Sequence, residues 1–219
     1  MMILESREEA GQKLALLLEK YQKESPVVLG IPRGGVVVAA EVAKKLGAPL
    51  DVLIVRKIGA PGHEETAIGA VMPDGTTLLN EELIARWRIP EEYISNAVAV
   101  QIREIRRRKE LYQRQAQNLE LKDKTVILAD DGIATGYTIE AAIRGLRKYA
   151  PKAVIVAAAV APAAVISRLR QSADEVVCLD TPEPFLAVGQ FYRHFAQTGD
   201  EEVIKLLREI EEAHGYENM

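Results

Sequence analysis

The chain has 219 residues, of which 48% are hydrophobic and 27% charged, and its formal net charge is −4. This length and apolar share supply the core of one α/β domain or of two small ones, and the negative charge gives no general attraction to nucleic acid or membranes. The single cysteine excludes an internal disulfide and predicts a reducing, cytoplasmic location.

The first half of the chain alternates predicted helices with short apolar strands. Ser6 and Glu9 have the spacing of a capping box, which predicts the start of an amphipathic helix. Short apolar runs predict buried strands, whereas residues 56–67, which are polar and contain Gly and Pro, are expected to form a loop. In chain order, the predicted elements are a helix at 6–23, a strand at 27–31, a helix at 36–46, a strand at 52–55, the loop at 56–67, and a hairpin of strands at 68–72 and 76–79.

The second half begins with helices and continues with strands that alternate with helices. Asn80 can cap a short helix that ends at Trp87. The longest apolar stretch, residues 153–166, contains Pro162 and is too short to cross a bilayer, so we expect no contact with membranes. The remaining predicted elements are helices at 90–119, 139–149, 163–171 and 200–213, strands at 126–129, 154–160 and 176–179, and an irregular aromatic segment at 181–195.

Apolar strands that alternate with helices predict an α/β fold with a parallel sheet covered on both faces. In such sheets, ligands bind at the carboxyl ends of the strands. The loops that follow Ile31, Val55 and Ala129 are therefore predicted to form one site.

The most specific pattern in the chain is the predicted strand that ends in two acids, Asp130 and Asp131, followed by a short loop and a helix. Such a loop can direct several backbone N–H groups at one phosphate, with a helix N-terminus behind them. The two acids repel phosphate and suit sugar hydroxyls or a hydrated metal ion. The alternative is an ordinary strand, turn and capped helix, which requires acids, loop length and threonines to coincide by accident. The loop residues are Gly132, Ile133, Ala134, Thr135, Gly136, Tyr137 and Thr138, of which the threonines add hydroxyl donors.

This segment resembles the ribose-5-phosphate motif of the type I phosphoribosyltransferases, which has four apolar residues, two acids and a loop that ends in Thr-Gly-x-Thr. The match covers thirteen positions, Val126 to Thr138. No Gly-Lys-Ser/Thr of a Walker loop follows, and no Gly-x-Gly-x-x-Gly fingerprint is present. The resemblance implies a type I phosphoribosyltransferase-like parallel sheet flanked by helices, in a single domain over residues 1–219. We expect a helical insertion at about 80–119 and a small hood at about 180–195.

The resemblance also implies an enzyme of nucleotide metabolism, a glycosyltransferase of the pentosyltransferase class. Its donor would be 5-phosphoribosyl-1-pyrophosphate with Mg²⁺, and its acceptor a nitrogenous base. Mg²⁺ keeps its waters, so it would be held mostly by ligand oxygens, with Asp130 or Asp131 nearby through water. A homodimer is expected. Two other functions stay open: a nucleotide or phosphoribosyl-pyrophosphate sensor without turnover, and a hydrolase that uses water as the acceptor.

Two other loops of the predicted site carry cations. In the loop after Ile31, glycines allow close approach of a ligand, and Arg33 offers a fork of donors to phosphate oxygens. The resemblance implies that Arg33, Gly34 and Gly35 bind pyrophosphate. After Val55, Arg56 and Lys57 precede glycines. This pattern favours a mobile lid that closes on a polyanion; the alternative is a solvated loop.

The resemblance implies that Arg56 and Lys57 are catalytic, because they would neutralise charge on departing pyrophosphate. The stretch that begins at Arg56 and the Ala-Ile-Gly-Ala stretch at 67–70 also resemble a group of stand-alone predicted phosphoribosyltransferases whose acceptor is not settled.

The acceptor is narrowed by one departure from the family pattern. Ala134 stands where the 6-oxopurine enzymes have an aspartate, and this departure argues against hypoxanthine or guanine as the acceptor. In having alanine at this position, the chain is similar to the adenine or uracil enzymes. Glu64 or Glu65 could supply an acid instead, although carboxylates in loops are usually solvated. In the hood, Phe185 could stack on a planar base or could anchor the loop as a core aromatic.

A basic stretch at 101–114 is the remaining feature of note. It could form an RNA-binding face, but Glu104 and Glu110 interrupt it and aromatic residues are few, which favours a solvated or subunit-contact face. We therefore expect no nucleic-acid partner. The three histidines have no metal-ligand spacing, so no zinc site is expected. The cations of this stretch are Arg103, Arg106, Arg107, Arg108, Lys109 and Arg114.

Overall fold

The computed structural model describes residues 2–112 and 120–213, apart from the side chains of Glu64 and Glu65. The described chain forms a five-stranded sheet in the order β2-β1-β6-β7-β8, in which all neighbours are parallel. The expected parallel sheet is thus present. Its strands are β1 (Val27–Gly30), β2 (Leu50–Val52), β6 (Thr125–Asp130), β7 (Ala153–Val160) and β8 (Glu175–Asp180).

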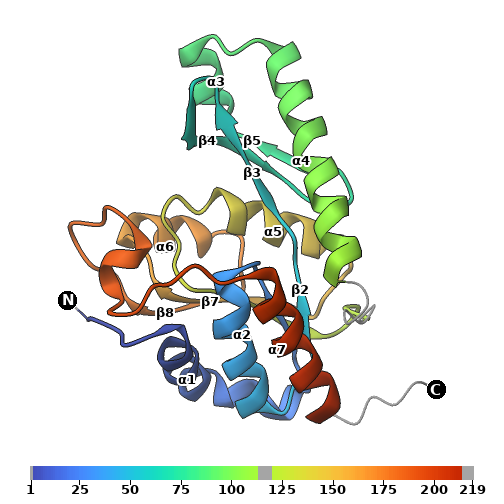
Figure 1. The fold of residues 1–219 in the computed structure, drawn as a ribbon, viewed down its shortest axis with the longest axis vertical. Helices are drawn as coiled ribbons and strands as arrows, with labels where there is room; N and C mark the ends of the chain where they lie inside the picture. Colours follow the sequence, from blue (N-terminus) through green and yellow to red (C-terminus); the bar gives the residue numbers. More distant parts are fainter. Residues whose placement is uncertain (1, 113–119, 214–219) are drawn as a thin grey trace.

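Helices cover both faces of this sheet (Figure 1). Alternate residues of a strand point to opposite faces, so that Val28 and Ile127 pack with the helices of one layer and Leu29 and Leu128 with those of the other. The first layer contains α1 (Arg7–Leu18), α2 (Gly34–Leu46) and α7 (Asp200–Ala213), and the second contains α5 (Tyr137–Arg147) and α6 (Ala163–Leu169).

A second, antiparallel sheet stands away from the first, together with two helices (Figure 1). We call these elements the projection. One face of its sheet packs on α4, and the other packs on α5, where Met72 contacts Gly145. The elements are β3 (Arg56–Ala60), β4 (His63–Val71), β5 (Thr77–Leu79), α3 (Glu81–Trp87) and α4 (Glu91–Tyr112).

The expectation of a loop at residues 56–67 is wrong, because β3 and β4 form a hairpin there. Its turn contains Gly62, whose φ of +69° is in the region that favours glycine. Along β3, exposed Lys57 alternates with buried Ile58 and Ala60, so the strand has period-two burial. The pattern was easily missed because alanines and glycines supply most of the inward positions.

Other boundaries differ less from the expectations. Ser6 caps α1, since its hydroxyl accepts a hydrogen bond from the Glu9 N–H at 3.4 Å, and the helix continues as a 3₁₀ turn, η1 (Glu19–Glu24). Strand β2 ends at Val52, before the buried residues Ile54 and Val55. The expected end of the long helix at residue 119 lies outside the described residues.

The hood is mostly irregular, with one short 3₁₀ turn, η2 (Val188–Phe191). Its aromatic anchor is Phe191, which is fully buried, and Tyr192 pairs with Leu4 near the N-terminus. Nowhere in residues 2–112 and 120–213 is there a helix with the length and apolar character to cross a membrane.

Candidate active site

Two loops meet at the carboxyl end of the parallel sheet. Strands β1 and β6 are neighbours, so the glycines after β1 lie against the acids that end β6. A Cβ on Gly35 would stand 2.9 Å from the Ala129 carbonyl oxygen and from Asp130 Oδ1, and a Cβ on Gly34 would collide with the Asp131 carboxylate. The structure thus brings together the loops expected to hold pyrophosphate and ribose.

The two acids have different surroundings. Asp131 Oδ2 accepts a 2.6 Å hydrogen bond from Arg7 Nε, and its carbonyl oxygen accepts one of 2.6 Å from the Tyr192 hydroxyl. Asp130 Oδ1 accepts the Asp131 N–H at 2.9 Å. Burial, and then the charge of Asp131, raise the pKa of Asp130 well above its usual value. The pair therefore combines one carboxylate held by a cation with one acid that retains its proton more strongly.

Arg7 is a site residue that the sequence analysis missed. Its Nη1 also donates to the Ala196 carbonyl oxygen at 2.7 Å, and its guanidinium lies 3.9 Å from the centre of the Phe195 ring. Burial, and then the charges of the acid pair, raise the pKa of Tyr192 beside it. Ser6 as N-cap places Arg7 at the start of α1, but no local pattern reveals a partner 124 residues away.

The loop after the acids contains hydrogen-bond donors without protein partners. Ile133 fixes the loop, since its N–H donates to the Val160 carbonyl oxygen at 2.9 Å. Gly136 has a φ of +80° immediately before α5. In the described ranges, the side-chain hydroxyls of Thr135 and Thr138 have no hydrogen-bond partner in the protein. Four backbone N–H groups of the loop also have none, namely those of Gly132, Ala134, Thr135 and Gly136.

Side chains from two other elements support this loop. Arg168 of α6 donates to the Thr135 carbonyl oxygen, and its guanidinium lies 5.3 Å from the centre of the Tyr137 ring. The Tyr137 hydroxyl accepts a hydrogen bond from the Asn80 amide. Asn80 caps α3, and its N–H donates to the Ile68 carbonyl oxygen of β4 at 2.8 Å. The loop is therefore connected to the projection.

Arg33 lies at the start of α2, in the N-cap position. The peptide bond that precedes it, from Pro32, is cis. Among the described residues, Arg33 forms no ion pair with a carboxylate. Arg33 is half-buried and directly precedes Gly34 and Gly35 in the chain.

The two expected lid cations lie on opposite faces of β3. Directly opposed residues of an antiparallel pair share a face: Arg56 pairs with Val71, which packs toward α4, whereas Lys57 pairs with Ala70, which packs toward α5. Arg56 Nε donates to Gln101 Oε1 of α4 at 2.9 Å, and burial, then the charge of Arg108, lower its pKa. The two cations therefore do not form one pair.

The hood supplies the expected aromatic residue in a supporting position. The ring centres of Phe185 and Phe191 are 5.0 Å apart, with a tilt of 41° between the rings. Phe185 is thus packed on the core of the hood. Ala134 is exposed in the loop that follows the acids. The side chains of Glu64 and Glu65, named above as substitute acids, lie outside the described residues.

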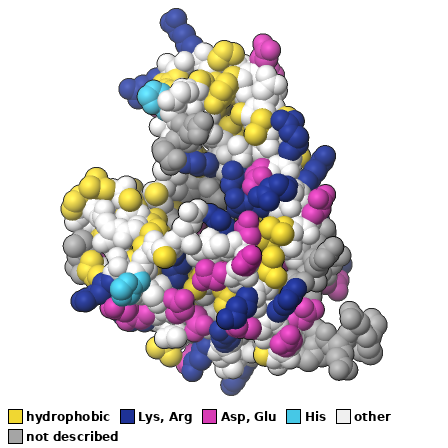
Figure 2. Space-filling view, viewed as in Figure 1, with side chains coloured by type: hydrophobic (Ala, Val, Ile, Leu, Met, Phe, Trp, Pro, Cys, Tyr) yellow, Lys and Arg dark blue, Asp and Glu magenta, His cyan; other side chains and the backbone are white. Residues whose placement is uncertain are grey.

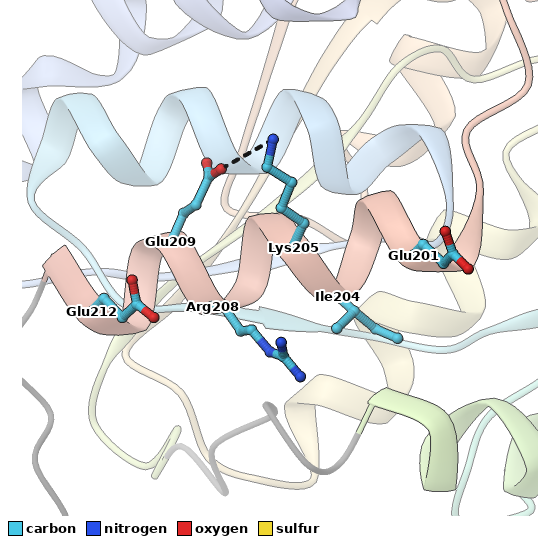
Figure 3. A pocket seen from close by; sticks show the side chains of 6 residues that line it. All are labelled: Glu201, Ile204, Lys205, Arg208, Glu209 and Glu212. Carbon is cyan, nitrogen blue, oxygen red and sulfur yellow. Dashed lines mark ion pairs between the residues drawn. The ribbon is translucent and has the colours of Figure 1, made fainter.

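A separate pocket of about 430 Å³ lies on the surface of α7 (Figure 3). Its side chains all come from that helix, and Lys205 and Glu209 form an ion pair of 3.6 Å across it. None belongs to the loops at the strand ends, so this pocket is separate from the site. The lining residues are Glu201, Ile204, Lys205, Arg208, Glu209 and Glu212.

Comparisons with known proteins agree with this fold. The chain belongs to the phosphoribosyl transferase family, whose domain model matches residues 3–194. The structure has a TM-score of 0.80 with the crystal structure of TT1426 from Thermus thermophilus, at 42% identity over 95% of this chain and 99% of that one. The type I phosphoribosyltransferase-like fold expected from the motif is thus confirmed.

Two curated relatives come from Mycobacterium tuberculosis strains CDC 1551 and H37Rv. Their names are "Putative phosphoribosyl transferase MT0597" and "Putative phosphoribosyl transferase Rv0571c". Each is 42% identical over 207 residues, which is 94% of this chain and 47% of the relative. The chain therefore spans about half the length of these relatives.

Proposed function

We propose that this protein transfers ribose 5-phosphate from 5-phosphoribosyl-1-pyrophosphate to a nitrogenous base and releases pyrophosphate. The observation that carries the proposal is the acid pair Asp130–Asp131 beside a loop whose backbone donors and threonine hydroxyls have no partner among the described residues. A polyanionic sugar phosphate needs both features, because carboxylates bind hydroxyls and N–H groups bind phosphate oxygens. Membership of the phosphoribosyl transferase family supports this proposal.

Each part of the site has a role in the proposed reaction. The loop at 132–138 binds the 5′-phosphate, and the acid pair lies by the ribose hydroxyls. Arg33, Gly34 and Gly35 hold pyrophosphate. Arg56 and Lys57 act as catalytic cations that meet negative charge as pyrophosphate leaves. Departure of this group leaves an oxocarbenium-like ribose, so catalysis is mainly positioning and electrostatics.

The acid pair can contact a ligand without losing Arg7. The guanidinium uses Asp131 Oδ2, which leaves Oδ1 for a ribose hydroxyl or for a water molecule. A carboxylate fixed at one oxygen presents the other in a defined direction. Arg7 therefore acts as a positioning residue in this proposal.

Two adjacent carboxylates at a strand end are oxygen donors of the kind that Mg²⁺ prefers. In the described ranges, no group of three or more His, Cys, Asp or Glu side chains could hold a metal ion. This donor set fits an ion that takes most ligands from donor oxygens and water, with Asp130 or Asp131 reached through water. The ion would supply charge neutralisation on the pyrophosphate group.

The acceptor is proposed to be a base other than hypoxanthine or guanine, because Ala134 provides no carboxylate beside the base. Phe185 packs on Phe191 but stays partly exposed, and it is proposed to stack on the base.

A panel of bases incubated with the donor and Mg²⁺ tests the proposal. We expect one base to yield a nucleotide, detected by mass, together with stoichiometric pyrophosphate. The variant Asp130→Asn/Asp131→Asn should remain folded by circular dichroism and release none. Pyrophosphate released equally without any base would identify a hydrolase, and donor binding without release would identify a sensor; either result overturns the transferase.

A further inference from the structure

One arginine of α4 occupies a position where the helix pattern calls for an apolar side chain. Ile105 and Tyr112 are 1% and 0% exposed, and Arg108 lies three residues after one and four before the other, so all three share a face. The Arg108 side chain is 15% exposed, against 56% for its neighbour Arg107. Arg108 therefore points into the molecule, whereas Arg103, Arg106, Arg107 and Lys109 are exposed.

The same face of α4 meets Arg56 of β3. Gln101 Oε1 accepts from Arg56 Nε at 2.9 Å, and one turn further along the helix Glu104 Oε1 accepts from Arg108 Nε at 2.8 Å. The two guanidinium groups are thus held on successive turns of one helix face. Burial, and then the positive charge of Arg108, lower the pKa of Arg56, as expected for two cations that lie close together.

Arg33 approaches this group from the parallel sheet. Tyr112, one turn after Arg108, donates to Asp200 Oδ1 at 2.5 Å. Burial and Asp200 raise the pKa of Tyr112, and the charges of Arg108 and Arg33 oppose that rise. Asp200 begins α7, which packs against α2, the helix that Arg33 caps, so Arg33 and Arg108 both approach this phenol although 75 positions separate them in the chain.

The cluster carries more positive than negative charge. Glu104 is shared between Arg107 and Arg108, and Asp200 accepts from a neutral phenol. Figure 2 shows Lys and Arg side chains gathered beside the notch between the projection and the parallel sheet. Half-buried cations without matching anions are unfavourable unless a ligand supplies the charge. A compact polyanion is the ligand that this arrangement fits.

We propose that Arg108, together with Arg33 and Arg56, binds the pyrophosphate group of the donor. This inference rests on the proposed function and adds to it a residue from the helical projection. A guanidinium fork can hold two phosphate oxygens at once, and Glu104 fixes the orientation of that fork. The projection thus closes the pyrophosphate end of the site, whereas the 5′-phosphate end belongs to the loop at 132–138.

Calorimetric titration of Mg²⁺-pyrophosphate, and separately of ribose 5-phosphate, tests the assignment in the full chain. The variants are Arg108→Gln, Arg108→Lys and the matched control Arg106→Gln, whose exposed side chain lies roughly 200° around the helix from Arg108. We expect Arg108→Gln to weaken pyrophosphate binding about tenfold or more, since a charged hydrogen-bond donor is lost. Arg108→Lys should give an intermediate loss, and Arg106→Gln less than about twofold. Ribose 5-phosphate binding should not change in any variant.

Equal pyrophosphate affinities for the wild type and both Arg108 variants would overturn the inference, as would equal losses for Arg106→Gln and Arg108→Gln. If circular dichroism shows Arg108→Gln to be unfolded, Arg108→Lys decides, because it keeps the stem and the charge but not the fork. A wild-type chain that binds no pyrophosphate also overturns the inference. By contrast, a chain that binds pyrophosphate through Arg108 but transfers no ribose overturns only the proposed function.

Discussion

Asp130 and Asp131 have different effects on the stability of the folded protein. Asp131 is compensated by Arg7, whereas burial, and then the charge of Asp131, raise the pKa of Asp130. A folded-state pKa above the unfolded value means that the folded protein binds the proton more tightly. Stability from this group is therefore present at low pH and is lost as pH rises through the folded pKa.

We predict that Asp130→Asn raises the melting temperature at pH 7 while it lowers turnover. The amide keeps an oxygen to accept the Asp131 N–H but carries no charge, so the gain should be on the order of 1 kcal/mol, or about 2–4 °C. Thermal unfolding at pH 7 and at pH 4 measures it. The gain in melting temperature should be smaller at pH 4, where Asp130 of the wild type is more protonated. A gain that is equal or larger at pH 4 would show that the charge of Asp130 is not the cause of the gain.

Lys57 and Arg56 are adjacent in sequence but point to opposite faces of β3, which separates their expected effects. We predict that Lys57→Ala slows single-turnover pyrophosphate release about a hundredfold, close to the 3 kcal/mol typical of one lost transition-state partner. The donor Kd should change little, because this cation meets charge that grows only as pyrophosphate leaves.

Arg56→Ala provides the comparison. Because Arg56 lies in the cluster with Arg108 and is also a proposed catalytic cation, its removal should raise the donor Kd as well as slow pyrophosphate release. If Arg56→Ala/Lys57→Ala changes only the Kd and leaves release intact, β3 and β4 form a binding flap, and the sensor gains support.

At the scale of elements, the β1–α2 and β6–α5 loops interlock through atoms that leave no room for a side chain. Gly34 is the tightest point, since a Cβ there would meet the Asp131 carboxylate and stand 2.6 Å from Arg7 Nε. The two loops are therefore in close contact where we propose that they bind pyrophosphate and ribose.

We predict that Gly34→Ala destabilises the protein by about 1–3 kcal/mol, the usual cost of forcing a group into a packed site. Donor binding should fall with it, because the Arg7–Asp131 ion pair is displaced. Urea unfolding and calorimetry measure the two effects. Gly199→Ala is the matched control, since nothing lies within 4 Å of its Cβ position, and its stability should be near that of the wild type. Similar results for the two variants would show that the loops are not interlocked.

At the scale of the whole molecule, the site is assembled from both sheets. The loop at 132–138 is connected through Tyr137 and Asn80 to β4, and Arg56 and Arg108 bring cations from the projection toward Arg33. A donor that spans the loop and the cluster would join the two parts. Ligand binding should therefore stabilise the molecule as a whole.

We predict that Mg²⁺ with 5-phosphoribosyl-1-pyrophosphate at a hundred times its Kd stabilises the protein by about 2.7 kcal/mol. Thermal unfolding with and without the donor measures this gain. Thr135→Val/Thr138→Val removes two hydroxyl donors of the loop while the fold is kept, so at the same concentration the gain should fall. An undiminished gain would mean that the phosphate binds elsewhere.

Much of this architecture could be predicted from local patterns. The apolar strand, two acids and the Thr-Gly-x-Thr loop predicted β6, the turn and α5, and the structure has them, with α5 beginning at Tyr137. The strand expected at 68–72 is the second part of β4, but β3 and the first part of β4 were not expected, because alanine and glycine leave a weak alternation. The orientation of Arg108 was also missed, since its neighbours along the helix are exposed cations.

The sequence by itself determined the parallel α/β fold and the phosphoribosyltransferase motif. Helix and strand periods, glycine turns and the paired acids are all patterns of residues that are close together in the sequence. Only the tertiary structure decided which distant side chains serve the site. Arg7 meets Asp131, Arg168 supports Thr135, and Arg108 joins Arg56 through packing of elements far apart in the chain. Such contacts depend on how the layers pack together. The residues that neighbour a long side chain in the sequence do not indicate which distant residue it will contact.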